Sequence, residues 1–426
     1  MRVARPCFGA GAWSHGVWHA LGALCRLSGW IKGFRGMKGR FWRVALAAGL
    51  LWAEPEAIHA GSPPTNKPGT PRPWGRIVRR ATYLEPPDSL LTRHLKDPTA
   101  VTWVFTREEW QMFPERVERA KVPAPLRQAL LAGTVAEEGG RVVFYPPHDA
   151  LDQLTPSMRD GIYPFLARNP ANVYHAAPIH ITSGSLTEWL SHSEIPEYTR
   201  RRFARYTWHS GKCLAFSDLG VFLSEAKYET ASLTLLRAFT QARTFLVEVQ
   251  IDPQTDRRRF IDYWTCSGER NETLPYLKSV AGMAANGPVS VDLAHLLPSL
   301  PRKLLYTFPE DPGNADKKLP HCHWTSLNFF NASADDSVLD LAAATTALVR
   351  DYKRVDPPYR FGDVIEIVSP EGGGYHSCIN IADNLVFTKN GDNPLCPWVV
   401  LEMADISQIY MPDDGWKVHG YRKTGP

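Results

Sequence analysis

The feature that most constrains the fold of this chain lies in its C-terminal hundred residues. There the spacing of apolar residues changes from a helical pattern to strand-like runs. Between Asp335 and Tyr352 the sequence predicts an amphipathic helix, whose apolar side consists of Val338, Leu341, Ala342, Thr345, Leu348, Val349 and Tyr352. Strand-like runs follow at 361–369, 375–382 and 384–391, and a last run at 398–412 could supply one or two more strands. Strands joined by such short connections pair antiparallel. Helices followed by an antiparallel meander predict an α+β domain.

A second helix is predicted just upstream, at residues 321–331, HCHWTSLNFFN. Pro320, a polar residue and then apolar side chains at helical spacing are typical of a helix start. Cys322 then lies in the first turn, where unpaired N–H groups and the positive end of the helix dipole stabilise a thiolate. Such a position can lower a cysteine pKa from about 8.5 into a range of about 3.5 to 7.5. Cys322 is therefore a candidate nucleophile, with a buried structural cysteine as the alternative.

A base for this thiol is expected at the start of the second predicted strand. His376 follows the glycine-rich loop PEGGG, and a histidine there, facing the helix of Cys322, can abstract the thiol proton. A solvated histidine at a loop end is the alternative. The ring needs a polar partner that fixes its tautomer. Thr388 and Asn390 lie two residues apart on the next predicted strand, and Asn390 is slightly favoured because its amide is the better hydrogen-bond acceptor.

This arrangement resembles the NlpC/P60-like cysteine hydrolases, a papain-related family, over about residues 320–412. In that family a cysteine opens a helix, Gly-Asp precedes the first strand, a histidine opens the second strand, and a polar residue follows on the third. The matching residues here are Cys322, Gly362-Asp363, His376 and Thr388, with Asn390 two residues further on. The resemblance implies a papain-like half-barrel, a helix pair with an antiparallel sheet, after a larger mixed α/β domain.

The resemblance also implies a reaction and a substrate class. Members of the family often cleave peptide or amide bonds in the stem peptides of bacterial cell walls, so a peptide or peptidoglycan substrate is expected. Cys322 is then the nucleophile and His376 the base, and no cofactor is needed. The N–H of Cys322 is expected to contribute to the oxyanion hole. Tyr306 is a candidate side-chain donor, because it lies just before the predicted connecting loop.

Three rival interpretations stay open. The sequence has His321-Cys322-His323 where the family usually has an Asp-Cys-Ser type of start, so a catalytically inactive binding or scaffold protein of the cell envelope is the first. The second keeps the dyad but uses it for deamidation or acyl transfer. The third is a zinc site, since these residues and His376 are all ligand types. Consecutive helical residues point about 100° apart and converge poorly on one ion, so no metal is expected.

The first 60 residues are predicted to be a targeting segment. From Met37 the chain has a basic stretch, MKGRFWR, then ten apolar residues, VALAAGLLWA, and a small-x-small end before Gly61. Ten residues span about 15 Å as a helix, too little to cross a bilayer. We expect Met37 to be the true start and residues 1–36 an upstream extension, with a longer unusual leader as the alternative. The protein is then exported, to the periplasm or the cell exterior.

The remainder divides at two stretches rich in proline, glycine and polar residues. Residues 61–76 predict an exposed linker and residues 307–320 a connecting loop. They separate a mixed α/β domain at 77–306, in which no motif assigns a role, from the hydrolase-like domain at 321–426. In the former, strands are expected at TAVTWVF (99–105), RVVFYPP (141–147) and 244–252, and helices near 198–208 and 231–242.

Charge and cysteine content bear on the partners. The whole chain has a formal charge of +4, but residues 61–426 hold 40 Lys/Arg and 42 Asp/Glu. The body therefore has no electrostatic footprint for nucleic acid. No stretch reaches about 18 apolar residues without a charge, so no membrane span is expected. The exported part keeps five cysteines; pairing Cys213 with Cys266 and Cys378 with Cys396 would leave Cys322 free.

Overall fold

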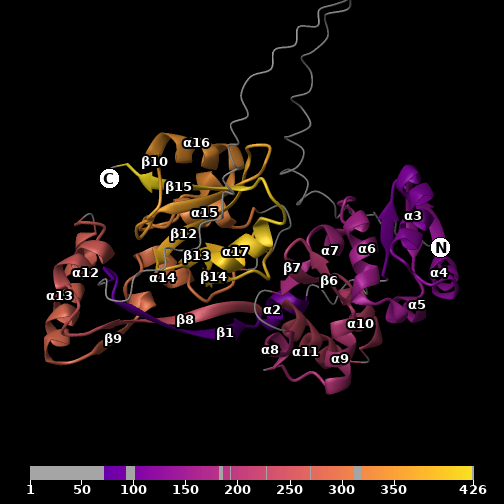
Figure 1. Ribbon diagram of the computed structural model, residues 1–426, viewed down its shortest axis with the longest axis horizontal. Coiled ribbons are helices and arrows are strands. Elements are labelled where there is room, and N and C mark those ends of the chain that lie inside the picture. Colours follow the sequence, from indigo (N-terminus) through magenta and orange to yellow (C-terminus); the bar gives the residue numbers. More distant parts are fainter. Residues whose placement is uncertain are drawn as a thin grey trace, which may run out of the picture. The chain divides into compact units, whose positions relative to one another are not determined.

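The computed structural model describes residues 72–92, 101–181, 186–191, 193–226, 228–268, 270–310 and 318–424. The predicted targeting segment, most of the predicted linker, residues 99 and 100 of the first predicted strand, and residues 311–317 of the connecting loop lie outside this part of the chain. Apart from Lys318, all described residues belong to one unit, Pro71–Pro312 with Leu319–Pro426. It combines helices with antiparallel sheets (Figure 1), which confirms the predicted α+β class.

Residues between 88 and 240 build a first hydrophobic core around one sheet of order β2-β4-β3 and another of order β5-β7-β6. The strands are β2 (Trp103–Phe105), β3 (Thr134–Glu138), β4 (Arg141–Tyr145), β5 (Ile179–Ile181), β6 (Thr207–Ser210) and β7 (Cys213–Phe216). The helices are α2 (Asp88–Leu91), α3 (Arg107–Arg119), α4 (Ala124–Leu131), α5 (His148–Gln153), α6 (Pro156–Leu166), α7 (Val173–Ala176), α8 (Leu186–Leu190), α9 (Glu197–Arg205), α10 (Leu219–Glu225) and α11 (Glu229–Thr240). The predicted strand at RVVFYPP and the helices near 198–208 and 231–242 are confirmed as β4, α9 and α11.

A buried ion pair lies inside this first core. Arg159 of α6 is fully buried, with its Nε 3.4 Å from Oδ2 of Asp218. Its guanidinium also donates to main-chain carbonyls, among them those of Leu151 and Arg205 at 2.9 Å each. The Tyr163 hydroxyl donates to the same Asp218 oxygen at 2.6 Å. Burial raises the pKa of Asp218, and Arg159 and Tyr163 oppose that effect. The buried charge of Arg159 is tolerated because Asp218 and main-chain carbonyls accept from it, while Oδ1 of Asp218 has no hydrogen-bond partner among the described residues.

Two long antiparallel strands connect the first core to the rest of the fold. β1 (Arg76–Leu84) pairs with β8 (Ala242–Ile251) over its whole length (Figure 1), and β9 (Val289–Asp292) extends the sheet. Thr244 of β8 is fully buried, and its Oγ1 accepts from the N–H of Val400 at 3.0 Å and donates to the carbonyl of Val400 at 3.1 Å. The predicted strand at 244–252 is thus confirmed and is attached to the C-terminal sheet. The elements beside it are α12 (Arg257–Trp264), η2 (Asn271–Thr273), α13 (Leu274–Met283), η3 (Ala284–Asn286), η4 (Leu293–His295) and α14 (Ser299–Leu304).

The C-terminal sheet has the order β10-β15-β11-β12-β13-β14, with all neighbours antiparallel. Its strands are β10 (Tyr352–Val355), β11 (Val364–Val368), β12 (Gly374–Ala382), β13 (Leu385–Lys389), β14 (Trp398–Glu402) and β15 (Lys417–Lys423), and its helices are α15 (Cys322–Leu327), η5 (Asp336–Leu339), α16 (Leu341–Asp351) and α17 (Met403–Tyr410). The meander from β11 to β14 was predicted. Its buried side chains join those of β8, β9 and α12 in a second core.

Two predicted elements differ in the structure. The helix expected from 335 to 352 is divided, because Asp340 adopts an extended conformation and caps α16 by accepting from the N–H groups of Ala342 and Ala343 at 3.0 and 3.1 Å. The run at 398–412 gives one strand and then the helix α17, where strands alone were expected. Glu402 and Asp405 form a capping box that starts α17.

The Gly-Asp pair before β11 has a structural reason for each residue. Gly362 has φ +86°, and a Cβ there would lie 2.1 Å from Cζ of Phe330, so only glycine fits. Asp363 is buried, and its carboxylate binds Arg422 of β15 at 2.8 and 2.7 Å. Its main-chain carbonyl accepts from the N–H of Asn380 at 2.9 Å. The pair therefore fixes the position of β11 between β12 and β15.

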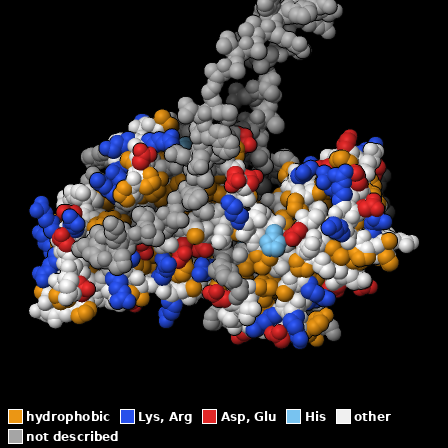
Figure 2. All heavy atoms as spheres, viewed as in Figure 1, with side chains coloured by type: hydrophobic (Ala, Val, Ile, Leu, Met, Phe, Trp, Pro, Cys, Tyr) orange, Lys and Arg blue, Asp and Glu red, His pale blue; other side chains and the backbone are white. Residues whose placement is uncertain are grey.

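Cysteines and surface charge complete the description. Cys213, Cys378 and Cys396 are free thiols, so neither suggested disulfide forms; Cys213 lies in β7, whereas Cys266 follows α12 and packs against the second core. Lys and Arg side chains are interspersed with Asp and Glu on the face shown in Figure 2. Within the described residues, no helix has the length and apolar content needed to cross a membrane.

Candidate active site

The first turn of α15 presents Cys322 as its first residue, as predicted. His321 caps the helix: its Nδ1 accepts from the N–H of Trp324 at 3.3 Å, and its Nε2 lies 3.2 Å from the carbonyl of Leu339. Because Nδ1 is an acceptor, the proton of this ring is on Nε2, which donates to that carbonyl. Farther along the helix, Thr325 Oγ1 accepts from Nε1 of Trp398 at 3.0 Å, which attaches α15 to β14.

The strands β12 and β13 separate next to this helix. Their ladder begins at the pair Ile379–Phe387 and runs from there to the turn. Closer to the start of β12, a side chain makes the connection: Thr388 Oγ1 donates to the carbonyl of Ser377 at 3.2 Å. The same hydroxyl lies 3.1 Å from Nε2 of His376. Thr388 is fully buried and His376 is 1% exposed, so both are held in a water-excluded position.

Thr388 and the His376 ring can form a chain of hydrogen bonds. A threonine hydroxyl has one proton. When Thr388 donates it to the carbonyl of Ser377, its oxygen accepts from an N–H at Nε2 of His376. In the neutral ring, Nδ1 is left with its lone pair and can act as a base. Tyr410 of α17 stacks on the ring, with centroids 3.9 Å apart and planes 10° from parallel, and so holds its plane.

The direction of His376 differs from the prediction. Ser377 is the residue of β12 that contacts α15, since its Oγ donates to Oγ of Ser326 at 3.0 Å. Side chains alternate along a strand, so His376 faces α17 and does not face α15 across the sheet. Cys322, at the very start of α15, nevertheless interacts electrostatically with His376. The charge of His376 thus acts on the thiol, although the two side chains project from different faces of the sheet.

The electrostatic surroundings of Cys322 favour its thiolate. The side chain is 6% exposed, and burial alone would raise its pKa. The charges of His323 and His376, and a hydrogen bond from His323, act in the opposite direction and lower the pKa of Cys322 well below its ordinary value. The first turn of a helix adds to this effect.

The last residue of β13 is a buried lysine, Lys389. Burial lowers the pKa of Lys389, and its charge interacts with that of Cys322. Its Nζ donates to the carbonyls of Gly391 and Asn393 at 2.8 and 3.0 Å. Lys389 therefore anchors the loop after β13 and adds positive charge near the thiol.

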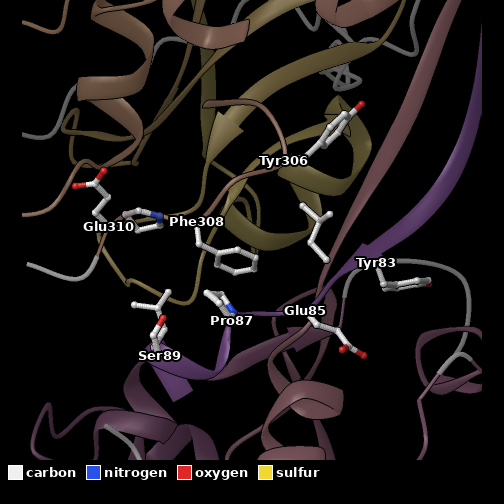
Figure 3. Close-up of a pocket in the computed structure, with 10 residues that line it drawn as sticks. Tyr83, Glu85, Pro87, Ser89, Tyr306, Phe308 and Glu310 are labelled. Atoms are coloured by element: carbon white, nitrogen blue, oxygen red, sulfur yellow. The ribbon is translucent and has the colours of Figure 1, made fainter. Parts of the chain in front are cut away.

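The remaining predicted residues lie elsewhere. Asn390, the favoured partner of His376, follows the end of β13, and its Oδ1 is buried with no hydrogen-bond partner within the described part of the chain. Tyr306 donates its hydroxyl to the carbonyl of Phe245 at 2.7 Å. It lines a pocket of about 800 Å³ with Phe308, and its hydroxyl points away from that pocket (Figure 3). The structure thus places His376 in contact with Thr388, whereas neither Asn390 nor Tyr306 hydrogen-bonds to the His376 ring within the described residues.

Three residues of the site were not predicted in their present roles. His323 was considered only as a zinc ligand. Glu366 belongs to β11 and lines a small cavity with His323. Tyr410 was placed in a possible strand; the signal that could have found it is the capping pair Glu402 and Asp405, which predicts a helix over the following residues. Across the described residues, no group of three or more His, Cys, Asp or Glu side chains could hold a metal ion.

Chemically, the arrangement offers a thiol that readily ionises, an imidazole with a free lone pair, and a hydroxyl that orients the imidazole. These are the parts that nucleophilic catalysis by cysteine requires. No family model, no curated protein and no solved structure matches the chain. The geometry of the site is therefore the basis on which a function is inferred.

Proposed function

We propose that this protein is a cysteine hydrolase that cleaves amide or peptide bonds by acyl transfer, with Cys322 as nucleophile and His376 as general base. The observation that carries the proposal is the 3.1 Å contact between Thr388 Oγ1 and Nε2 of His376, whose charge acts on the thiol at the first residue of α15. Thr388 takes the orienting role for which Asn390 was the favoured candidate. A hydroxyl that accepts from Nε2 leaves Nδ1 to exchange protons with the sulfur.

The proposal includes the finer fold. Residues 321–426 are assigned to a papain-like half-barrel of the NlpC/P60 type, with α15 and α16 as the helix pair. What supports this is the order of the elements, with the thiol on the first helix and the histidine on the second strand of the β11–β14 meander. The Gly362-Asp363 pair, at the position that the resemblance implies, adds to the support because both residues position β11.

The reaction follows two steps, and a proton taken from water in the second replaces the one given to the leaving nitrogen in the first. The Cys322 thiolate attacks the carbonyl carbon, and a carbon–sulfur bond forms while the carbonyl electrons move to oxygen. His376, which holds the thiol proton, gives it to the leaving nitrogen as the carbon–nitrogen bond breaks. Water then attacks the thioester, His376 takes a proton from it, and the thiolate leaves. The N–H of Cys322, in the first turn of α15, is the proposed donor to the oxyanion.

The proposed substrates are the stem peptides of bacterial cell walls, and the proposed location is outside the cytoplasm. Both follow from the resemblance and from the targeting segment predicted from Met37. The mixed α/β region between 77 and 306 would then meet the wall polymer or a partner protein in the same compartment.

The test is product analysis with defined muropeptides and glutamine-bearing peptides, by mass spectrometry. The expected result is cleavage of an amide bond by the wild-type protein and none by Cys322→Ala. Release of ammonia from glutamine would indicate deamidation, and transfer to an added amine would indicate acyl transfer. Equal turnover by the Cys322→Ala variant would exclude the thiol mechanism. A reactive Cys322 without turnover of any of these peptides would favour the inactive binding or scaffold protein.

A further inference from the structure

We propose that His323, which lines a small cavity together with Glu366, is a second imidazole partner of Cys322: it supplies the resting positive charge that keeps the sulfur ionised, while His376 carries out the proton transfers. This inference rests on the proposed function, since it assigns a division of labour within the same site. In an ordinary cysteine–histidine pair one ring does both tasks. Here two rings act on one sulfur, His323 through a hydrogen bond and its charge, and His376 through its charge.

The placement of His323 follows from the first turn of α15. It comes directly after Cys322 and is partly buried. Its side chain borders a cavity of about 20 Å³ that Glu366 of β11 also lines, together with Ser326 and Ser377. In the sheet Glu366 lies opposite Ser377, the residue whose hydroxyl contacts α15. A carboxylate and an imidazole therefore line one small cavity on the α15 side of the sheet, whose remaining lining includes Leu327, Leu348 and Val364.

The chain keeps room for the Glu366 carboxylate. Gly374, the first residue of β12, has no side chain where a Cβ would lie 2.2 Å from Oε1 of Glu366. Any larger residue at 374 would push the carboxylate out of this position, because the neighbouring group is the end of a flexible side chain. Gly374 lies two residues before His376, so the same strand that carries the first imidazole makes space for the partner of the second.

Charges around the two rings agree with the assignment. Burial would lower the pKa of His323, but the charge of Cys322, a hydrogen bond to it and the charge of Glu366 raise it. Burial raises the pKa of Glu366, against His323 and a hydrogen bond from Tyr421 of β15. The titratable or charged groups that interact with the Cys322 sulfur are His321 and His323 next to it, Glu366 on β11, His376 and Cys378 on β12, Lys389 on β13 and Tyr410 on α17.

Two imidazoles predict a signature that one does not. If His376 alone ionised the thiol, its loss would return Cys322 to the behaviour of an ordinary buried cysteine. With His323 in place, the sulfur of a His376→Ala variant remains partly ionised near neutral pH although turnover is lost. Conversely, a His323→Asn variant keeps its general base, and its activity should return at higher pH.

The experiment measures the rate of Cys322 alkylation by iodoacetamide against pH, with the site of modification read by mass spectrometry. The variants are His323→Asn, His376→Ala, the double variant, Glu366→Gln and Gly374→Ala. Thr345→Val, at an exposed residue lining the same cavity, is the matched control. An opposite charge within a few ångströms shifts a pKa by about one to three units, so His323→Asn should move the alkylation midpoint up by at least about one unit. Glu366→Gln and Gly374→Ala should move it in the same direction by less.

Two results would overturn the inference. One is a midpoint in His323→Asn equal to that of the control. The other is a His376→Ala midpoint already as high as that of the double variant. If His323→Asn does not fold, the alkylation midpoints of Glu366→Gln and Gly374→Ala test the inference instead. Midpoints equal to that of the control in both variants would contradict it. Alkylation needs no substrate. Absence of hydrolysis would therefore refute the proposed function, while the alkylation midpoints would still test the role of His323.

Discussion

Replacing Thr388 by valine is the perturbation that isolates the orientation of His376. Valine has nearly the same shape but cannot accept from Nε2, which lies 3.1 Å from the hydroxyl. A hydrogen bond to a group that is charged during the reaction contributes about 1.5 to 3 kcal/mol. Since about 1.4 kcal/mol corresponds to a factor of ten, kcat/KM of Thr388→Val should fall by about 10- to 150-fold. The carbonyl of Ser377 also loses its donor, so the free energy of unfolding should fall by about 1 to 3 kcal/mol.

The assay is hydrolysis of the peptide that the wild-type protein cleaves, together with nitrogen-15 NMR of the His376 ring, which reports the nitrogen that carries the proton. Thr388→Ser keeps the oxygen and is the matched control, with activity and tautomer close to those of the wild type. Wild-type kcat/KM in Thr388→Val would refute the orienting role of Thr388. So would a Thr388→Ser variant as impaired as Thr388→Val, because bulk and not the hydrogen bond would then be responsible.

Three further predictions concern the scaffold. Arg159→Met leaves Asp218 buried without its cation and should lower the free energy of unfolding in urea by about 3 to 5 kcal/mol, whereas adding Asp218→Leu should restore much of it; equal loss in both contradicts the ion-pair account. Burial lowers the pKa of His175 to about 3, so the unfolded chain binds this proton first as the pH falls below about 6.5, and stability should decline by up to about 1.4 kcal/mol per pH unit until about pH 3. His175→Phe should remove that part of the slope, and identical slopes would contradict it. Gly362→Ala, at φ +86° and against Phe330, should lower the free energy of unfolding by more than Gly372→Ala does, at φ +89° with open space. The difference, measured by thermal or urea unfolding, should exceed about 1 kcal/mol. An equal decrease in both variants would mean that backbone strain alone is responsible.

The sequence predicted those features that local patterns determine. Pro320 and the spacing of the apolar residues placed the start of α15, and alternation placed the meander from β11 to β14. The sequence left both Thr388 and Asn390 as partners of His376, and Asn390 was favoured only because an amide is the better hydrogen-bond acceptor. In the structure Thr388 lies within β13 and contacts His376, whereas Asn390 follows the last residue of the strand, Lys389. The exact end of a strand is difficult to predict from its own residues.

Features that depend on distant pairing were not predictable. β15 enters the sheet between β10 and β11, a contact across more than fifty residues that no local pattern encodes. The attachment of β8 to β14 depends on Thr244, which looks like an ordinary strand residue in the sequence. The ion pair of Arg159 with Asp218 joins two helices of the first core in the same way. The sequence predicted that His376 faces the helix of Cys322, whereas the structure stacks it on Tyr410 of α17, a helix that the run at 398–412 was not expected to form.

The central claim, that Cys322 is ionised by an imidazole of the same site, is tested most directly by titrating its thiolate. The ultraviolet absorbance of the wild-type protein, minus that of Cys322→Ser, is followed from acid to alkaline pH. We expect the midpoint well below about 8.5, the ordinary cysteine pKa, and an upward shift when His376 is replaced by alanine. A wild-type midpoint at or above about 8.5, unmoved by that replacement, would contradict the account.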